Sequence, residues 1–291
     1  MDFGGEFMKR IVILFVLAAI VVSLLLLMLL PLKRQNSKQM IKAIQQSDYT
    51  LLTELVEKSP EAALQSPNAS PNWWFALMDT PAYDVFPPLH WACYQGDLEA
   101  VQIILAVGIS VNHPDSFGNY SPLMACMMSD SNQKTYIANL LLDNGADPFV
   151  KCEFNIYPDA LCQSIRLLQD MTGSEQEKEV ALFERILQMA SPETYDFGEA
   201  LNTAVVLNNS YATRRILEFA SVSVNSPLVV NGYVWAASLL HRAVERNASL
   251  EYIQFLLSIG ADKTLTDKNG KTAYDYAIEN GYTELAELLK P

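Results

Sequence analysis

A short motif recurs along most of this 291-residue chain, and its spacing constrains the fold more than any other feature. The copies are PPLHWA at residues 87–92, SPLMAC at 121–126, SLLHRA at 238–243 and TAYDYA at 272–277. Leu89 and Leu123 are 34 positions apart, and so are Leu240 and Tyr274. A fixed period of this length is typical of stacked helical repeats and argues against a globular enzyme core.

Three further motifs lie in a consistent order around these copies. They are GAD at residues 145–147 and 260–262, GDLEAV and GYTELA at 96–101 and 281–286, and DKNGKT at 267–272. The combination resembles the ankyrin-repeat family, whose signature is T-P-L-H-x-A with a period of about 33 residues. The resemblance implies an all-α solenoid of helix-turn-helix repeats with β-hairpin loops. It also implies that His90 and His241 form hydrogen bonds within and between repeats.

The recurring leucines and glycines have distinct structural roles in such a repeat. We expect the leucines to begin the buried face of each inner helix, and most of the glycines to accept the left-handed geometry that ends a helix. The leucines are Leu89, Leu123 and Leu240, and the glycines are Gly108, Gly145 and Gly260, with Gly270 in the hairpin motif.

The period defines the domain organisation. We predict an ankyrin-repeat domain over residues 37–291, with an N-terminal capping pair at 37–64, an insertion at 65–86 and repeats at 87–291. The capping pair has a polar start and lacks the proline motif, as expected for a repeat that faces water on one side.

Two stretches inside the repeats depart from the pattern. Residues 173–179 are polar and predict a long turn before an outer helix at 181–189. Residues 226–237 contain Asn231-Gly232, which is a strong tight-turn signal between β-forming residues. We expect a lengthened β-hairpin there.

An apolar block precedes the repeats. Residues 11–30 are apolar apart from Ser23, and about 20 such residues suffice for a transmembrane helix. A cleaved signal peptide is the competing interpretation, but the run is long and no A-x-A-like site follows it. We predict an uncleaved anchor, with a basic tail at residues 8–10 and a linker at 31–36. Residues 1–7 look like an artefact or tag, because Met8 resembles a native start.

The orientation of this anchor has two interpretations. Basic residues should be in excess on the cytoplasmic side. Lys9 and Arg10 precede the block, whereas Lys33, Arg34, Lys38 and Lys42 follow it, which favours a cytoplasmic repeat domain. A very short basic tail before an apolar block is instead the usual layout of a bacterial signal-anchor. We expect a single-pass inner-membrane protein with a periplasmic domain, and a cytoplasmic domain is the alternative.

The charge of the repeat domain restricts its partners. Beyond Lys42 the chain has 14 Lys and Arg against 31 Asp and Glu, a net charge near −17. Nucleic-acid binding needs a basic footprint, so we exclude it. The charge is compatible with a basic protein partner that is attracted by the negative electrostatic field of the domain. Acidity can also simply keep such a domain soluble.

The sequence has no motif that would support catalysis or a cofactor. It contains no H-E-x-x-H, G-x-S-x-G or Walker-type loop, and no C-x-x-C pair. We expect no cofactor, no metal and no small-molecule substrate. Cys93 and Cys126 should be packed thiols, whereas Cys152 and Cys162 could approach each other as a disulfide or remain free.

Aromatic side chains in the loops are the best candidates for binding. Trp and Tyr are typical interface anchors, and large apolar side chains on loops are costly to leave in water. The predicted partner-binding residues are Trp73, Trp74, Phe75, Tyr83, Phe117, Tyr120, Tyr233 and Trp235. The alternative is that these aromatics fold back to cover the repeat ends.

These features favour a non-catalytic, membrane-tethered protein-binding module. The ankyrin resemblance implies that the partner lies across a concave face made of hairpin tips and inner helices. In bacteria such a protein can neutralise a toxin, as an immunity protein does. The alternatives are a structural scaffold of a membrane or envelope stress-protection complex and an enzyme, for which no motif argues.

Overall fold

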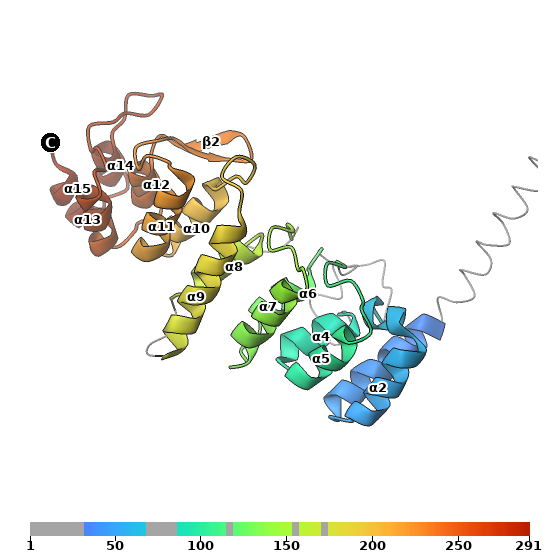
Figure 1. Ribbon diagram of the computed structural model, residues 1–291. Coiled ribbons are helices and arrows are strands. Elements are labelled where there is room, and N and C mark those ends of the chain that lie inside the picture. Colours follow the sequence, from blue (N-terminus) through green and yellow to red (C-terminus); the bar gives the residue numbers. More distant parts are fainter. Residues whose placement is uncertain (1–31, 68–85, 115–118, 153–156, 170–173) are drawn as a thin grey trace, which may run out of the picture. The chain divides into compact units, whose positions relative to one another are not determined.

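The computed structural model describes residues 32–67, 86–114, 119–152, 157–169 and 174–291 (Figure 1). The chain divides into two compact units, Met1–Ile137 and Ala138–Pro291. The boundary falls inside helix α7 (Lys134–Asp143). Each unit is built from short helices that run in pairs.

The first unit begins with a helix that includes residues 32–45. Residues 32–36, which we expected to be a linker, belong to this helix. The chain then reverses at Ser47, which has a φ of 53°, and Asp48 caps α2 (Tyr49–Lys58) by accepting a hydrogen bond from the Leu51 N–H. The short 3-10 helix η1 (Pro60–Leu64) follows and packs against α2.

The repeats of the first unit begin where the proline motif predicts a helix. Helix α4 (Pro88–Gln95) packs on α5 (Leu98–Leu105) and α6 (Pro122–Met127). Proline is tolerated at the first helical position because its missing N–H would have no partner there. Ser121 caps α6 by accepting from the Met124 N–H. Helix α5 packs against α2, which joins the capping pair to the first regular repeat.

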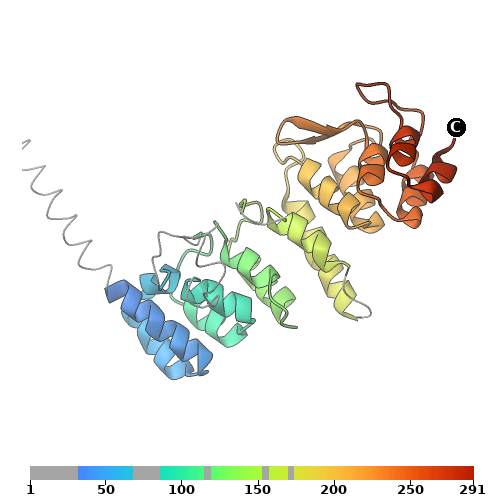
Figure 2. The same cartoon turned by 180° about the vertical axis from the view of Figure 1, so that it is seen from behind.

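The second unit continues the pairing (Figure 2). Its helices are α8 (Ala160–Leu167), α9 (Ser174–Met189), α10 (Gly198–Val206), α11 (Ser210–Ala220), α12 (Leu239–Glu245), α13 (Leu250–Ser258), α14 (Ala273–Glu279) and α15 (Thr283–Leu289). The first helices of the pairs, α8, α10, α12 and α14, pack on one another in sequence. The second helices α11, α13 and α15 do the same. We call these the inner and outer helices.

Helix α9 corrects one prediction. We expected a turn over residues 173–179, but α9 begins at Ser174 and includes the rest of that polar stretch. Its sequence, SEQEKEV, is polar but rich in Glu, Gln and Lys, which are good helix formers on a solvent-facing surface. Polarity therefore marked an exposed helix start and not a turn.

The motif residues form the core and join neighbouring repeats. Leu89, Leu123 and Leu240 are fully buried. His90 Nε2 donates to the Tyr120 carbonyl oxygen at 2.9 Å, and His241 Nε2 donates to that of Lys271 at 3.2 Å. Each imidazole thus links its inner helix to the chain that enters the next repeat. The motif glycines, Gly108, Gly145, Gly260 and Gly270, all have positive φ.

The predicted hairpin is present between α11 and α12. Strand β1 (Leu228–Val230) pairs antiparallel with β2 (Tyr233–Ala236) to form a two-stranded sheet. In Figures 1 and 2 it projects from the same end of the helix pairs as the loop before α14. Strand β1 contacts α10 and strand β2 contacts α12.

Several predictions concern residues beyond those that the structure describes. The apolar block at residues 11–30 and most of the insertion at 65–86 lie outside the described residues. Among the helices that are described, none has the length and apolar character needed to cross a membrane. The four cysteines, Cys93, Cys126, Cys152 and Cys162, are all buried and all free, so Cys152 and Cys162 do not form a disulfide.

Candidate protein-binding surface

The hairpin owes its conformation to its two turn residues. Asn231 and Gly232 have φ values of 50° and 78°, the pair of positive angles that a type I′ turn requires. Asparagine tolerates the left-handed region better than most residues, and glycine has no Cβ to oppose it. Leu228 and Val230 are buried and fix β1 to the helices beneath.

A bulge in β2 breaks the usual alternation of buried and exposed side chains. Val230 pairs with Tyr233 and Val229 with Val234, but Leu228 pairs with Ala236, so Trp235 has no partner across the ladder. An extra residue of this kind bends the strand and re-aims its side chains. Tyr233, Val234 and Trp235 are all exposed, at 75%, 67% and 44%.

We call these three residues the hairpin ridge. A run of three exposed apolar residues on one strand loses hydrophobic stabilisation in the isolated chain, and such runs are design errors unless they serve a function. Aromatic residues that protrude from a rigid support are typical anchors of protein interfaces. The ridge therefore has the composition of a contact surface.

Trp235 is held in place from the helix below it. The guanidinium of Arg242 lies 5.3 Å from the centre of the Trp235 ring, within the range of a cation–π interaction. Arg242 itself is only 8% exposed, donates to Asn202 at 2.8 Å and pairs with Glu245 at 3.2 Å. Residues of α10 and α12 thus support the ridge.

A hollow of about 230 Å³ lies between β2 and the loop before α14. Its lining residues are Val234, Trp235, Ala236, Ala237, His241, Glu245, Asp267, Lys268, Asn269 and Tyr276. Asp267 accepts hydrogen bonds from the Lys271 N–H at 2.9 Å and the Tyr276 hydroxyl at 2.9 Å. The backbone hydrogen bond from Lys271 contributes most to lowering the pKa of Asp267 to about 2, and the bond to Asp267 raises the pKa of Tyr276 to about 12.

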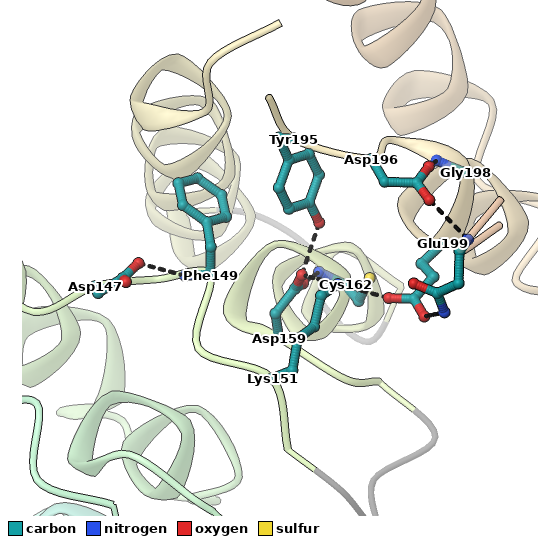
Figure 3. A network of polar contacts seen from close by, with 10 residues as sticks. Asp147, Phe149, Lys151, Asp159, Cys162, Tyr195, Asp196, Gly198 and Glu199 are labelled. Carbon is teal, nitrogen blue, oxygen red and sulfur yellow. Dashed lines mark hydrogen bonds and ion pairs between the residues drawn. The ribbon is translucent and has the colours of Figure 1, made fainter. Parts of the chain in front are cut away.

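The tip of the hairpin is anchored by two carboxylates at the start of α10 (Figure 3). Asp196 accepts from the Asn231 N–H at 2.7 Å and from the Gly198 N–H at 2.9 Å. Glu199 accepts from the Asn231 side-chain amide at 2.9 Å. Gly198 lets β1 approach, because a Cβ at this position would overlap the carbonyl group of Val229. The turn is therefore docked on α10 and does not project freely.

A polar network continues from Glu199 toward α8 (Figure 3). Lys151 Nζ bridges Asp159 at 2.7 Å and Glu199 at 2.5 Å. The Tyr195 hydroxyl donates to Asp159 at 2.7 Å, and the same carboxylate caps α8 by accepting from the Cys162 N–H at 2.9 Å. Asp159 is completely buried, so these donors offset the cost of removing its charge from water.

The ionisable groups of this network have shifted pKa values. Burial lowers the pKa of Lys151, but the Asp159 carboxylate outweighs that effect and the net pKa is raised. Burial raises the pKa of Tyr195 and, separately, that of the Cys162 thiol. A reactive cysteine needs an accessible thiolate, and Cys162 is fully buried. The network stabilises the repeat and the hairpin base without offering a nucleophile.

The predicted binding residues are distributed over both units. Trp73, Trp74, Phe75, Tyr83 and Phe117 lie outside the described residues. Tyr120 lies in the first unit, where it is half-buried with its ring 6.3 Å from that of Phe86. Tyr233 and Trp235 lie together on the hairpin ridge of the second unit.

Several residues of this surface had no signal strong enough to predict them. The exposure of Val234 could be predicted from the hairpin only if both faces of β2 were known to be exposed. That exposure is not encoded in any turn motif. Arg242 and Glu245 resemble ordinary polar positions of an inner helix. Gly198 would have been found by asking which glycine lacks a turn role. In the described part of the chain no cluster of His, Cys, Asp or Glu could hold a metal ion.

Comparison with known proteins agrees with the repeat fold. A family model for ankyrin repeats (3 copies) matches residues 40–152 and 201–291, which is more than half of the chain. The chain therefore belongs to the ankyrin-repeat family. Proteins of this class are in general non-enzymatic modules for protein interaction.

The individual relatives have low sequence identity, but the matches cover most of each chain. The ankyrin repeat protein YahD of Escherichia coli K12 is 27% identical over 205 residues, 68% of this chain and 92% of YahD. The human ASB11 ankyrin repeat domain is 20% identical with a TM-score of 0.55, over 87% of this chain and 97% of that domain.

A bacterial complex contains another similar structure. A chain in the complex of the predatory endopeptidase Bd0816 from Bdellovibrio bacteriovorus with the immunity protein Bd3460 is 24% identical, with a TM-score of 0.52. The match covers 69% of this chain and 95% of that one. At these identities the two solved structures show a shared fold.

Proposed function

We propose that this protein is a non-catalytic binding module that holds a partner protein through the hairpin ridge and the neighbouring inner-helix face. One observation carries the proposal: Tyr233, Val234 and Trp235 are exposed side by side on a bulged strand. Arg242, Asp196 and Glu199 hold the hairpin rigid. A rigid apolar ridge loses little entropy on binding, so its buried area contributes efficiently to affinity.

The test uses the full chain in detergent, immobilised and exposed to lysate of the bacterium that makes it. We expect a protein retained at moderate salt by the wild type to be lost from the double variant Tyr233→Ser, Trp235→Ala. The matched control is Tyr136→Ser, because Tyr136 is an aromatic residue on α7 that is 59% exposed and lies outside the ridge. Retention of no protein, or equal retention by the ridge variant, argues against this function.

We further propose that the module neutralises a toxic enzyme at the cell envelope, as an immunity protein does. The support is the similarity to a chain of the endopeptidase–immunity complex, together with the acidic repeat domain and the apolar block at residues 11–30. The scaffold of a membrane or envelope stress-protection complex is the other candidate. An immunity protein should be encoded beside a toxic effector, and cells that lose it should be killed by that effector. Survival of such cells favours the scaffold.

Membrane tethering belongs to the same proposal. We propose a single inner-membrane span at residues 11–30 with the repeat domain in the periplasm. Fusion of alkaline phosphatase to the C-terminus tests this placement, because the enzyme is active only after export. An inactive phosphatase fusion together with an active cytoplasmic reporter would place the domain in the cytoplasm.

A further inference from the structure

The size of the hollow beside the ridge limits what it can hold. At about 230 Å³ it lies below the roughly 300–1,000 Å³ typical of small-molecule pockets. It is large enough for one long side chain. Because the hollow borders the hairpin ridge, a partner protein on the ridge would place a side chain in it.

One wall of the hollow is apolar. Val234, Trp235, Ala236 and Ala237 form this side. Such a wall favours contact with the aliphatic part of an incoming side chain, whose burial releases water from both surfaces.

The hollow is also lined by two carboxylates, those of Glu245 and Asp267. Asp267 is ionised at neutral pH, and Glu245 uses Oε2 for Arg242 at 3.2 Å. No hydrogen bond in the described residues reaches Glu245 Oε1, which is free to accept one. Among the lining residues the charged side chains are Glu245, Asp267 and the exposed Lys268, which sum to −1, while the cations of Arg242 and Lys271 lie beside the hollow against Trp235 and Tyr276.

The aromatic side chains at this site already bind cations of the same chain. Arg242 lies over Trp235 at 5.3 Å, and Lys271 lies over Tyr276 at 5.9 Å. Trp235 remains 44% exposed, so part of its ring is open to a further contact. Ring faces of Trp and Tyr attract cations through their quadrupole.

An amphipathic hollow matches an amphipathic side chain. Lysine and arginine have an apolar stem and a charged head, and they bury the stem while the head remains near polar groups. An acidic side chain of a partner would instead be repelled by the carboxylates of Glu245 and Asp267. A second copy of this chain would bring a domain with a net charge near −17 against the same surface, since residues beyond Lys42 have 14 bases and 31 acids.

We infer that the hollow between β2 and the loop before α14 accepts one lysine or arginine side chain of the partner protein. The inference rests on the proposed binding function and names the chemistry of the partner: a basic residue flanked by apolar residues. Its stem lies along Val234 and Trp235, and its cationic head lies between Glu245 and Asp267.

The test measures this chemistry with defined probes. The full chain in detergent is labelled with fluorotryptophan, and Trp235→Phe identifies the fluorine NMR signal of Trp235. The probes are acetyl-Val-Arg-Val-methylamide and its norleucine and glutamate analogues. We expect the arginine peptide to shift the Trp235 signal in a saturable way, with an affinity roughly threefold to fivefold above that of the norleucine peptide. The glutamate peptide should produce no saturable shift.

Two charge variants separate this inference from a general effect of net charge. Glu245→Gln should reduce the affinity for the arginine peptide to that for the norleucine peptide measured on the same variant, a comparison in which any change of the ridge itself cancels. Glu251→Gln on α13 removes the same charge from an outer helix and should change neither. Equal affinity for arginine and norleucine, or an arginine affinity unaffected by Glu245→Gln, overturns the inference. A partner retained through the ridge but insensitive to Glu245→Gln would overturn it and leave the proposed function standing.

Discussion

His90 and His241 occupy the same motif position but have different partners at Nδ1. Ser238, three residues before His241, caps α12 and places its hydroxyl 2.9 Å from His241 Nδ1. Pro87 is the corresponding residue for His90, so α4 has no side-chain cap and His90 Nδ1 is buried without a hydrogen bond. One substitution at the cap position therefore affects two polar groups.

The first prediction is that Pro87→Ser is more stable than Pro87→Ala by about 1 kcal/mol, the usual contribution of an N-cap. The backbone at Pro87, with φ −56° and ψ 155°, resembles that of the capping Ser121, so serine fits without strain. The midpoint and slope of urea unfolding measure the change. Pro87→Ala is the control, because it removes the ring without adding a hydroxyl. A serine variant no more stable than the alanine variant would contradict the capping argument.

The second prediction concerns pH. Burial lowers the pKa of His90 from 6.5 to about 3, so the folded protein keeps this imidazole neutral. In the unfolded chain His90 binds a proton as the pH falls below about 6.5, whereas in the folded protein it stays neutral down to about pH 3. Protonation therefore favours the unfolded chain, and the free energy of unfolding decreases as the pH falls from about 6.5 toward 3. The loss is up to about 1.4 kcal/mol per pH unit.

The variant His90→Gln isolates this contribution from that of the carboxylates. Its free energy of unfolding should fall less steeply than that of the wild type between about pH 6 and pH 4, because it has no imidazole to protonate. Urea unfolding at several pH values measures both slopes. Equal slopes would show that His90 takes up its proton in the folded state as readily as in the unfolded one.

At the scale of elements, the hairpin depends on a close approach that only glycine permits. Gly198 lies at the start of α10, and a Cβ there would overlap the backbone of Val229 in β1. Backbone cannot move aside as a flexible side chain can. The hairpin or the helix start must therefore shift in any variant with a side chain at this position.

The third prediction follows: Gly198→Ala displaces the hairpin and increases hydrogen exchange at the amides of β1 and β2. Ala is otherwise a better helix former than Gly by about 1 kcal/mol, so local helix propensity would produce the opposite effect. Gly108→Ala in the other unit is the control for strain without a clash: its positive φ makes alanine strained there, but no atom lies near the added methyl group, so exchange at β1 and β2 should not change. Unchanged exchange in the Gly198 variant would show that β1 is not seated on α10.

The elements also show what a sequence can predict. Helix starts followed from the proline motif and its caps, and the hairpin followed from Asn231-Gly232, because these signals act within a few residues. The start of α9 was missed because polar helix formers resemble a turn. The bulge at Trp235 and the Asp159 network could not be predicted from the sequence. The bulge depends on which backbone groups of β1 pair with β2, and the network depends on contacts between residues that are distant in the sequence.

At the scale of the whole molecule, stacked repeats distribute stability locally. In such proteins each repeat contacts only its neighbours, so stability is close to a sum of repeat and interface contributions. This chain has two compact units, and each contains a fully buried motif leucine, Leu89 in the first and Leu240 in the second. The two leucines therefore report on different parts of the chain.

The fourth prediction uses them as a reciprocal pair. Leu240→Ala should cost about 2–5 kcal/mol, the usual range for a buried leucine, and raise hydrogen exchange mainly in residues 138–291. Leu89→Ala should have a similar cost and raise exchange mainly in the described residues up to Ile137. Helix α7 crosses the boundary, so its amides should respond to both variants. If either variant raised exchange equally in both units, the repeats would unfold as one cooperative body, and a disturbance at the hairpin ridge would then reach the N-terminal capping pair.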